Sequence, residues 1–154
     1  MVATIKTIQG GAKAVSRYFE LLEEVSDYYG TNSHSEWLGK AASLLGLDGP
    51  VERQAFENLL TGRDPSGRPL GNLARKQRVP GYDITLSVPK SVSVLWAIGN
   101  EEIQQQVEKA LLEAARRTMA ELESDLPLAR RGRGGKSDIK ANLAIGMCLS
   151  LIHI

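Results

Sequence analysis

At 154 residues the chain is long enough for one domain of ordinary size and too short for two. Hydrophobic residues at 42% and charged residues at 24% are typical of soluble globular proteins, which excludes a wholly disordered or collagen-like chain. The single cysteine, Cys148, cannot form an internal disulfide. Met1–Ile8 lacks the apolar core of a signal peptide, and the longest nearly apolar stretch, Leu143–Ile154, is too short to span a membrane. We therefore expect a cytoplasmic protein.

The formal charge of +1 conceals two basic segments. The first contains Arg63, Arg68, Arg75, Lys76 and Arg78 beside one acidic residue, Asp64, and the second contains Arg130, Arg131, Arg133, Lys136 and Lys140 beside Asp138. If folding brings both to one face, they form an electrostatic footprint for a polyanion. From charge alone, it is an equally good explanation that both segments are simply solvated loops.

The first half of the chain predicts a strand followed by helices. Residues 3–8 alternate like a strand, Gly10-Gly11 interrupt it, and apolar residues from position 12 onward recur at helical spacing. Trp37–Leu47 and Val51–Leu60 predict two further helices. The stretch 62–81, rich in proline and basic residues, predicts a long loop or flap.

The second half predicts strand, helix, helix and strand. Tyr82–Val88 alternates, and Pro89 suits the first turn of a helix that runs to Ile98. Asn100 is a good N-cap for a helix that extends through Leu122. After a glycine- and arginine-rich stretch at 128–136, residues 141–147 predict a buried strand.

Three tyrosines near the N-terminus, Tyr18, Tyr28 and Tyr29, are candidate nucleophiles. A tyrosine hydroxyl has a pKa near 10, so only about one in a thousand is ionised at neutral pH. Cleavage of a phosphodiester by tyrosine would therefore require a nearby carboxylate and a metal or cations. The alternative is that these rings lie half in the core with their hydroxyls in water.

Asp83 is unusual because it is a charged residue within a strand of apolar residues. It either faces solvent or is held for a chemical purpose. The glycines near Lys136 do not form a nucleotide-binding loop, because Arg130 stands where that motif needs a glycine.

The stretch GYDITLSVPKSVSVLWAIG, Gly81–Gly99, resembles the signature of the TrwC-type conjugative relaxase domain of the MobF class. Tyr18-Phe19, Tyr28-Tyr29 and the stretch 36–47 also match in order and spacing. The resemblance covers residues 1–146.

This resemblance implies an α+β fold of the HUH endonuclease type, with an antiparallel β-sheet backed by helices. It implies a nickase that cuts one DNA strand at a plasmid transfer origin through a covalent 5′-phosphotyrosine intermediate. By position, Tyr18 would be the first nucleophile, Tyr28 the second with Tyr29 beside it, and Asp83 the carboxylate that contacts the nucleophile. The expected partners are single-stranded DNA and other relaxosome proteins. The candidate DNA-binding residues are Arg75, Lys76, Arg78, Arg130, Arg131 and Arg133.

The chain departs from the family at its metal site. Relatives hold a divalent metal, Mg or Mn, with three histidines, whereas this chain has two, His34 in a polar stretch and His153 outside the expected spacing. We therefore assign no metal ligand. We expect residues 1–146 to be the N-terminal part of a relaxase domain, truncated before the metal-binding strand, and 147–154 to be a non-native or truncated tail. Such a fragment should be inactive, and a non-catalytic single-stranded DNA-binding module is the alternative function.

Overall fold

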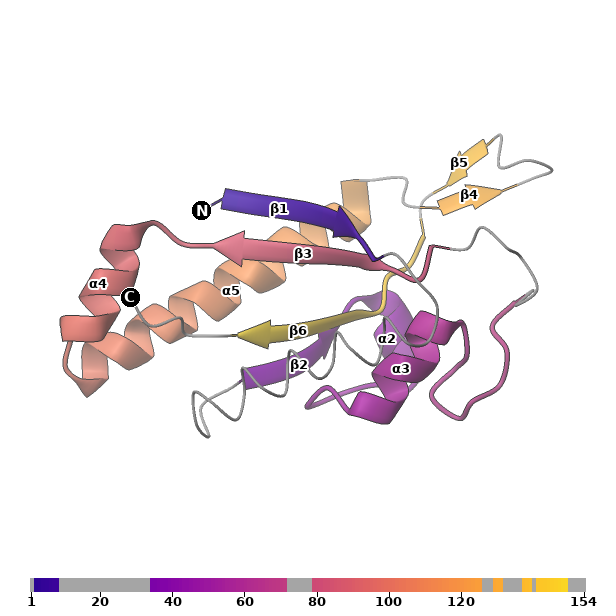
Figure 1. The fold of residues 1–154 in the computed structure, drawn as a ribbon, viewed down its shortest axis with the longest axis horizontal. Helices are drawn as coiled ribbons and strands as arrows, with labels where there is room; N and C mark the ends of the chain where they lie inside the picture. Colours follow the sequence, from indigo (N-terminus) through magenta and orange to yellow (C-terminus); the bar gives the residue numbers. More distant parts are fainter. Residues whose placement is uncertain are drawn as a thin grey trace.

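The computed structural model describes residues 2–8, 34–71, 79–125, 129–131, 137–139 and 141–149. Six strands and four helices lie in these ranges (Figure 1). They are β1 (Val2–Thr7), β2 (His34–Leu38), α2 (Lys40–Leu44), α3 (Arg53–Thr61), β3 (Tyr82–Ser87), α4 (Lys90–Ile98), α5 (Glu101–Asp125), β4 (Ala129–Arg131), β5 (Ser137–Ile139) and β6 (Ile145–Leu149). The molecule is therefore an α+β protein, as the sequence predicts.

The strands form three antiparallel pairs. β1 pairs with β3, with Ile5 opposite Ile84, and β2 pairs with β6, with Trp37 opposite Gly146. β4 and β5 form a separate hairpin that projects beyond the end of the β1–β3 pair (Figure 1). Among the described residues, β3 pairs with β1 alone and β6 with β2 alone.

The hydrophobic core lies between the β2–β6 pair and helices α2 and α3. Trp37, Ala42 and Ala55 are buried there, and the ring of Phe56 lies 6.1 Å from the ring of Trp37. Gly146 permits this packing, because a Cβ on it would stand 3.0 Å from two carbons of the Phe56 ring.

Helices α4 and α5 form a hairpin with a local cap. The Oδ1 atom of Asn100 accepts a hydrogen bond from the amide of Ile103 at 3.0 Å, which confirms the predicted N-cap. The indole of Trp96 donates to Glu108 Oε1 at 3.1 Å, and the side chain of Gln104 donates to the carbonyl of Trp96. These contacts bind α4 to the first turns of α5.

Two acidic side chains fasten α5 to the rest of the fold. Glu36 on β2 accepts a bidentate pair of hydrogen bonds from Arg116, at 2.8 and 2.9 Å, and this partner raises the pKa of Arg116. The buried Glu123 uses one oxygen, Oε1, to accept the amides of Lys40 and Leu143 at 2.9 and 2.7 Å. Glu123 therefore stabilises the N-terminus of α2 and the segment before β6 together.

Gly39 makes this arrangement possible. Its φ of 93° lies in the left-handed region, and a Cβ would stand 2.2 Å from the carbonyl oxygen of Leu143. Any side chain at this position would therefore separate α2 from the segment before β6 that Glu123 holds.

The structure corrects three sequence predictions. Trp37 lies in β2, and the helix that was predicted from it is limited to α2, because the buried strand pairing of Trp37 with Gly146 overrides local propensity. His34 also belongs to β2 and not to a polar loop. Residues 141–144 are irregular, and the last strand, β6, begins at Ile145 and extends through Leu149.

The remaining element predictions agree with the structure within the described residues. β1, β3, α3, α4 and α5 lie where the pattern places them. The helix predicted from position 12 lies outside the described residues. None of the helices in the described ranges is long and apolar enough to cross a membrane.

Candidate functional site

Asp83 is the second residue of β3, where it is half-buried. Its partner across the β1–β3 pair is Lys6. Since side chains alternate along a strand, Asp83, Thr85 and Ser87 share one face of the pair. Directly opposite residues of an antiparallel pair project to the same side, which adds Lys6 and Thr4 to this face. Asp83 therefore belongs to a polar face of the β1–β3 pair.

The other face of the pair is mainly apolar. Ile84 and Leu86 of β3 share it with Ile5 and Ala3 of β1, and Tyr82 stands at its end. The alternation of a strand lets it hold a carboxylate on one side and contribute apolar packing on the other. The two sequence signals of this stretch, alternation and a single charge, are thus explained by a two-faced strand.

The first basic segment begins with a tight turn after α3. The Oδ1 atom of Asp64 accepts the hydroxyl of Ser66 at 2.7 Å and the amide of Arg68 at 2.8 Å, and its Oδ2 accepts Arg68 Nε at 2.8 Å. The amide of Leu70 also donates to the carbonyl of Gly62 at 2.9 Å. The described part of the predicted loop is therefore a closed turn, built on an Asp-Pro-Ser-Gly sequence that favours turns.

Hydrogen bonding makes Asp64 a stronger acid than usual. The donor of Ser66 contributes most, the backbone and side-chain donors of Arg68 add to it, and burial opposes them. The net result lowers the pKa of Asp64 from 3.8 to about 2. Asp64 is thus ionised near neutral pH, and its carboxylate accepts the hydrogen bonds that close the turn.

The chain is fixed again where the segment returns to the sheet. The amide of Ile8 donates to the carbonyl of Gly81 at 3.0 Å, and a Cβ on Gly81 would stand 3.0 Å from Leu60 Cδ2. The basic segment is consequently anchored before residue 72 by the Asp64 turn and after residue 78 by Gly81.

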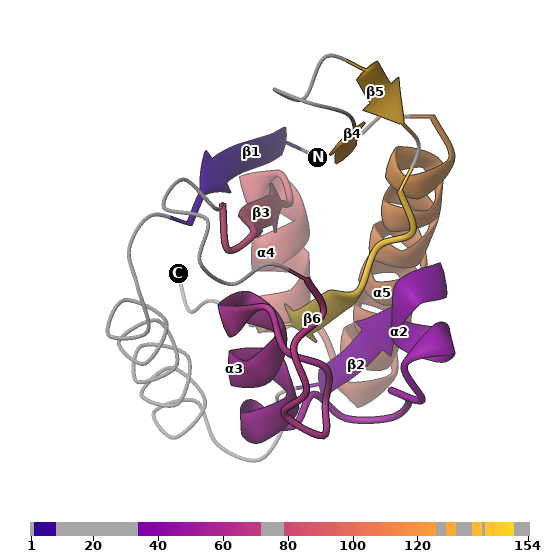
Figure 2. The same ribbon diagram turned by 90° about the vertical axis from the view of Figure 1, so that its right-hand side faces the viewer.

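The second basic segment begins in the β4–β5 hairpin. Arg130 and Arg131 lie in β4, with Asp138 and Ser137 as their partners in β5. In Figure 1 the turn after α3 and this hairpin lie toward the same end of the molecule, and α4 lies at the opposite end. Figure 2 looks onto that end. The flanks of both basic segments therefore lie toward one end of the molecule, and in Figure 2 the hairpin lies at the top of that end and the turn after α3 toward its bottom.

Several predicted site residues lie outside the described residues. They are Tyr18, Tyr28, Tyr29, Arg75, Lys76, Arg78 and Arg133. Asp83, Arg130 and Arg131 are the predicted site residues that the structure describes, the two arginines by their backbone. Sequence reasoning did not single out Asp64, although the turn sequence that follows it could have indicated its role.

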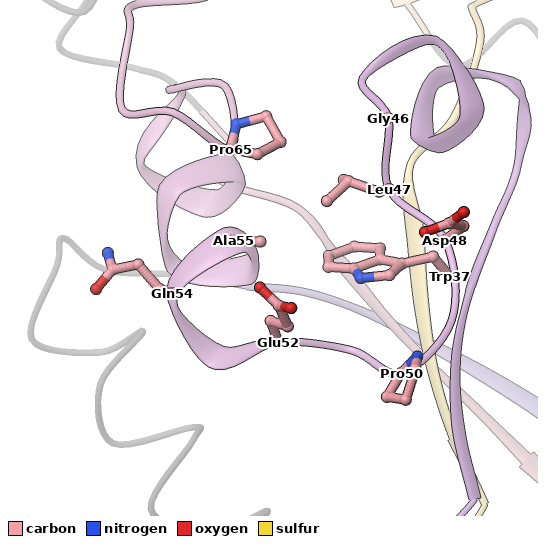
Figure 3. Close-up of a pocket in the computed structure, with 9 residues that line it drawn as sticks. All are labelled: Trp37, Gly46, Leu47, Asp48, Pro50, Glu52, Gln54, Ala55 and Pro65. Atoms are coloured by element: carbon pink, nitrogen blue, oxygen red, sulfur yellow. The ribbon is translucent and has the colours of Figure 1, made fainter.

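A shallow pocket of about 250 Å³ lies beside the core (Figure 3). The ring of Trp37 faces Ala55 of α3 across it, and the carboxyl groups of Asp48 and Glu52 stand at its rim. Its lining residues offer an aromatic wall and two carboxylates. We assign no chemistry to this pocket.

The described residues do not fit a metal centre. No group of three histidine, cysteine, aspartate or glutamate side chains in the described ranges could hold a metal ion. The backbone of His34 lies in β2, opposite Leu149 of β6. No step of a reaction is therefore routed through a metal held by this part of the chain.

Comparison with known proteins gives consistent matches. The family model described as TrwC relaxase matches residues 12–148. The multifunctional conjugation protein TraI of Escherichia coli K12 is 40% identical over 79 residues, which are 49% of this chain and 4% of TraI. The chain thus spans a small part of the length of this curated relative.

Solved structures agree with the sequence match. The conjugative relaxase TrwC in complex with oriT DNA has a TM-score of 0.71 and 31% identity, over 94% of this chain and 50% of that one. A metal-bound complex of TrwC with oriT DNA has a TM-score of 0.69 and 31% identity, over 94% of this chain and 49% of that one. This chain spans about half of each.

Proposed function

The chain belongs to the TrwC relaxase family, and from this premise we propose that it holds single-stranded DNA of a conjugative transfer origin. The two basic segments bind the phosphates: Arg75, Lys76 and Arg78 in the first, and Arg130, Arg131 and Arg133 in the second. TrwC has been solved with oriT DNA, which supports this class of ligand. Other relaxosome proteins would join the complex on the DNA.

The observation that supports the proposal is that a described flank of each basic segment lies toward the same end of the molecule. Each has a described flank at the same end of the molecule, although about fifty residues separate them in the chain. One nucleic acid strand can therefore contact both segments, and each phosphate contact displaces counterions.

Tyr18 is the proposed nucleophile, with Asp83 as the carboxylate that orients it. In the reaction, the tyrosine oxygen would bond to phosphorus as the bond to the 3′ oxygen breaks. Asp83 would accept the proton of the tyrosine, the 5′ phosphate would remain on the tyrosine, and the departing 3′ oxygen would take a proton from water to leave as a hydroxyl. Tyr28, with Tyr29 beside it, would serve the later strand transfer.

We propose that this chain by itself binds DNA without cleaving it. The metal-bound TrwC complex supports a metal requirement in the family, with Mg or Mn as the proposed ion. The sequence has two histidines, and the described residues offer no ligand set. Without a cation to neutralise the phosphate, the poorly ionised Tyr18 hydroxyl has little reactivity. The binding module proposed from the sequence is therefore the activity that this chain retains.

The experiment compares binding with covalent capture. Fluorescein-labelled single strands, one carrying the oriT sequence that TrwC binds and one of thymidines, are titrated by fluorescence anisotropy, with the oriT duplex as control. Samples with Mn²⁺ or Mg²⁺ are then run on a denaturing gel. We expect salt-sensitive, reversible binding to the single strands and no adduct.

Two results would contradict the proposal. Absence of single-strand binding at low salt would overturn the DNA-binding function. A denaturation-resistant adduct that Tyr18→Phe abolishes would overturn the proposed inactivity, and would establish Tyr18 as the nucleophile.

A further inference from the structure

Trp37 keeps an unused hydrogen-bond donor although its side chain is buried. Its exposed fraction is 8%, and its indole N–H has no acceptor within the part of the chain that the structure describes. The other tryptophan, Trp96, donates its indole N–H to Glu108 at 3.1 Å, the usual arrangement for a tryptophan that is removed from solvent. No fully buried polar side-chain atom in the described ranges lacks a partner, so the N–H of Trp37 opens onto the pocket that its ring lines (Figure 3). A donor left in this position indicates a ligand that supplies the acceptor.

The walls of this pocket are formed before any ligand arrives. Trp37 belongs to the β2–β6 ladder, and its amide donates to the carbonyl of Gly49 at 3.1 Å. In the same loop, the amide of Leu47 donates to the carbonyl of Ala42 at 2.9 Å. The buried Ala55 of α3 forms the wall that faces the indole. A ligand therefore meets a fixed surface and loses little free energy to reorganisation of the protein.

The rim of the pocket is acidic. Asp48 and Glu52 are exposed there, on either side of the indole in Figure 3, and none of the lining residues is basic. Neither carboxylate has an ion-pair partner among the described residues. Arg53, which follows Glu52 in the sequence, is bound to Glu57 at 3.1 Å. The pocket therefore attracts cations and repels the phosphates of a nucleic acid.

The size and lining of the pocket narrow the choice of cation. Its volume of about 250 Å³ is below the roughly 300–1,000 Å³ of sites that enclose whole drug-sized molecules, so it suits one side chain with its peptide group. Trp37, Leu47 and Ala55 offer apolar surface to the hydrocarbon stem of a long cationic side chain. A guanidinium fits better than an ammonium, because it is planar, stacks on aromatic rings and presents donors to two carboxylates.

We infer that this pocket binds an arginine side chain from an extended segment of a partner protein. The guanidinium is held by Asp48 and Glu52, the stem covers the ring of Trp37, and a peptide carbonyl of the segment accepts the indole N–H. The segment is extended because a helix would use its own carbonyls. Since Pro65 of the turn after α3 also lines the pocket, the partner lies beside that turn. The inference goes beyond DNA binding and does not depend on it.

The test follows the indole N–H signals of the ¹⁵N-labelled chain by NMR. The chain has two tryptophans, so Trp96→Phe assigns the signal of Trp37. The blocked tripeptide acetyl-Ala-Arg-Ala-amide is titrated, and the tripeptides with lysine or glutamine at the central position are the controls. We expect a saturable downfield shift of the Trp37 signal with the arginine peptide, weaker binding of the lysine peptide, no binding of the glutamine peptide and an unchanged Trp96 signal.

Paired substitutions at the rim test the role of charge. Asp48→Asn with Glu52→Gln keeps the size of both side chains, and we expect about 2- to 30-fold weaker binding of the arginine peptide, the range for loss of two exposed ion pairs. Glu113→Gln with Glu121→Gln removes the same charge from exposed positions of α5 and should leave binding unchanged. Since Trp37 lies in the core, the rim substitutions carry the test, and thermal unfolding checks that both pairs are folded.

Several results would overturn the inference. They are the absence of a saturable shift with the arginine peptide, equal binding of the lysine or glutamine peptide, and an equal loss of binding in both substituted pairs. A Trp37 signal that moves with protein concentration alone would identify a second copy of this chain as the occupant. A shift with oligothymidine would identify nucleic acid as the ligand. DNA binding by the same variants is measured separately by anisotropy, so the proposed function stands or falls on its own.

Discussion

Glu123 shows how one buried side chain can decide the geometry of a distant segment. Its Oε1 atom accepts amides from Lys40 and Leu143, residues that no local pattern connects. Asp64 acts similarly within its turn, where one carboxylate satisfies a hydroxyl, an amide and a guanidinium. At the scale of single residues, the fold depends on acids that accept backbone donors.

Replacing Glu123 should therefore cost stability. Glu123→Ala leaves two part-buried amides without an acceptor, and we expect a loss of about 2–4 kcal/mol in the free energy of unfolding, measured with urea. Glu123→Gln retains a carbonyl oxygen and should lose less. Glu121→Ala, an exposed position on the same helix, is the control, and an equal effect of Glu121→Ala would refute the role of Glu123.

The acidity of Asp64 predicts a pH dependence. Its pKa is about 2 in the folded chain and 3.8 in the reference state, so the unfolded chain binds the proton more strongly. The stabilisation by its carboxylate is complete above about pH 4 and is lost as the pH falls toward 2. The difference in melting temperature between the wild type and Asp64→Asn should shrink over this range. A constant difference from pH 6 to pH 2 would contradict this account.

The position of strand β6 depends on its pairing with β2 and on its packing against the core. Gly146 lies opposite Trp37 and against the ring of Phe56, so the strand approaches the core only because this position lacks a Cβ. The sequence indicated a strand in this region, but it gave no signal for its partner β2, which is remote in the chain.

Gly146→Ala should therefore disturb the β2–β6 pair. The added methyl group would stand 3.0 Å from two Phe56 carbons and 3.3 Å from Val51 Cγ1, and such overpacking costs about 1–3 kcal/mol. Chemical denaturation measures the loss. Gly67→Ala is unsuitable as a control because Gly67 has a positive φ, whereas Gly71→Ala has open space and should be nearly neutral.

Local patterns predicted the elements whose stability is local. Short stretches of sequence are enough to recognise the amphipathic spacing of α3 and α5, the cap at Asn100 and the alternation of β3. The strand at Trp37 was missed because its partner lies more than a hundred positions away, and α2 was predicted too long because Glu123 sets its beginning. Asp83 and the basic segments stay predictions from charge and pattern, whereas the exposure of Tyr82 could be seen only in the folded chain.

The molecule as a whole has two different ends. The turn after α3 and the β4–β5 hairpin occupy one end, and α4 occupies the other, where Val94, Leu95 and Ile98 are exposed (Figure 1). If the first end holds the nucleic acid, charge removed there should change binding, and charge removed along α5 should not.

The paired substitution Arg130→Ala and Arg131→Ala tests this polarity. Each arginine that contacts a phosphate contributes about 0.7 to the slope of log affinity against log salt for a single strand. We expect the slope to fall by about 1.4 in magnitude, measured by anisotropy with an oriT oligonucleotide. Lys109→Ala, an exposed site on α5, should leave the slope unchanged, and an equal change there would refute a localised interface.

The register of β2 with β6 has a consequence for biosynthesis. His34 meets Leu149, so the ribosome must add about 110 further residues before β2 can find its partner. At ordinary translation speeds this takes about 5 to 20 seconds. During that time β6 does not yet cover the indole of Trp37. A chaperone that binds unfolded chains would bind at this exposed indole.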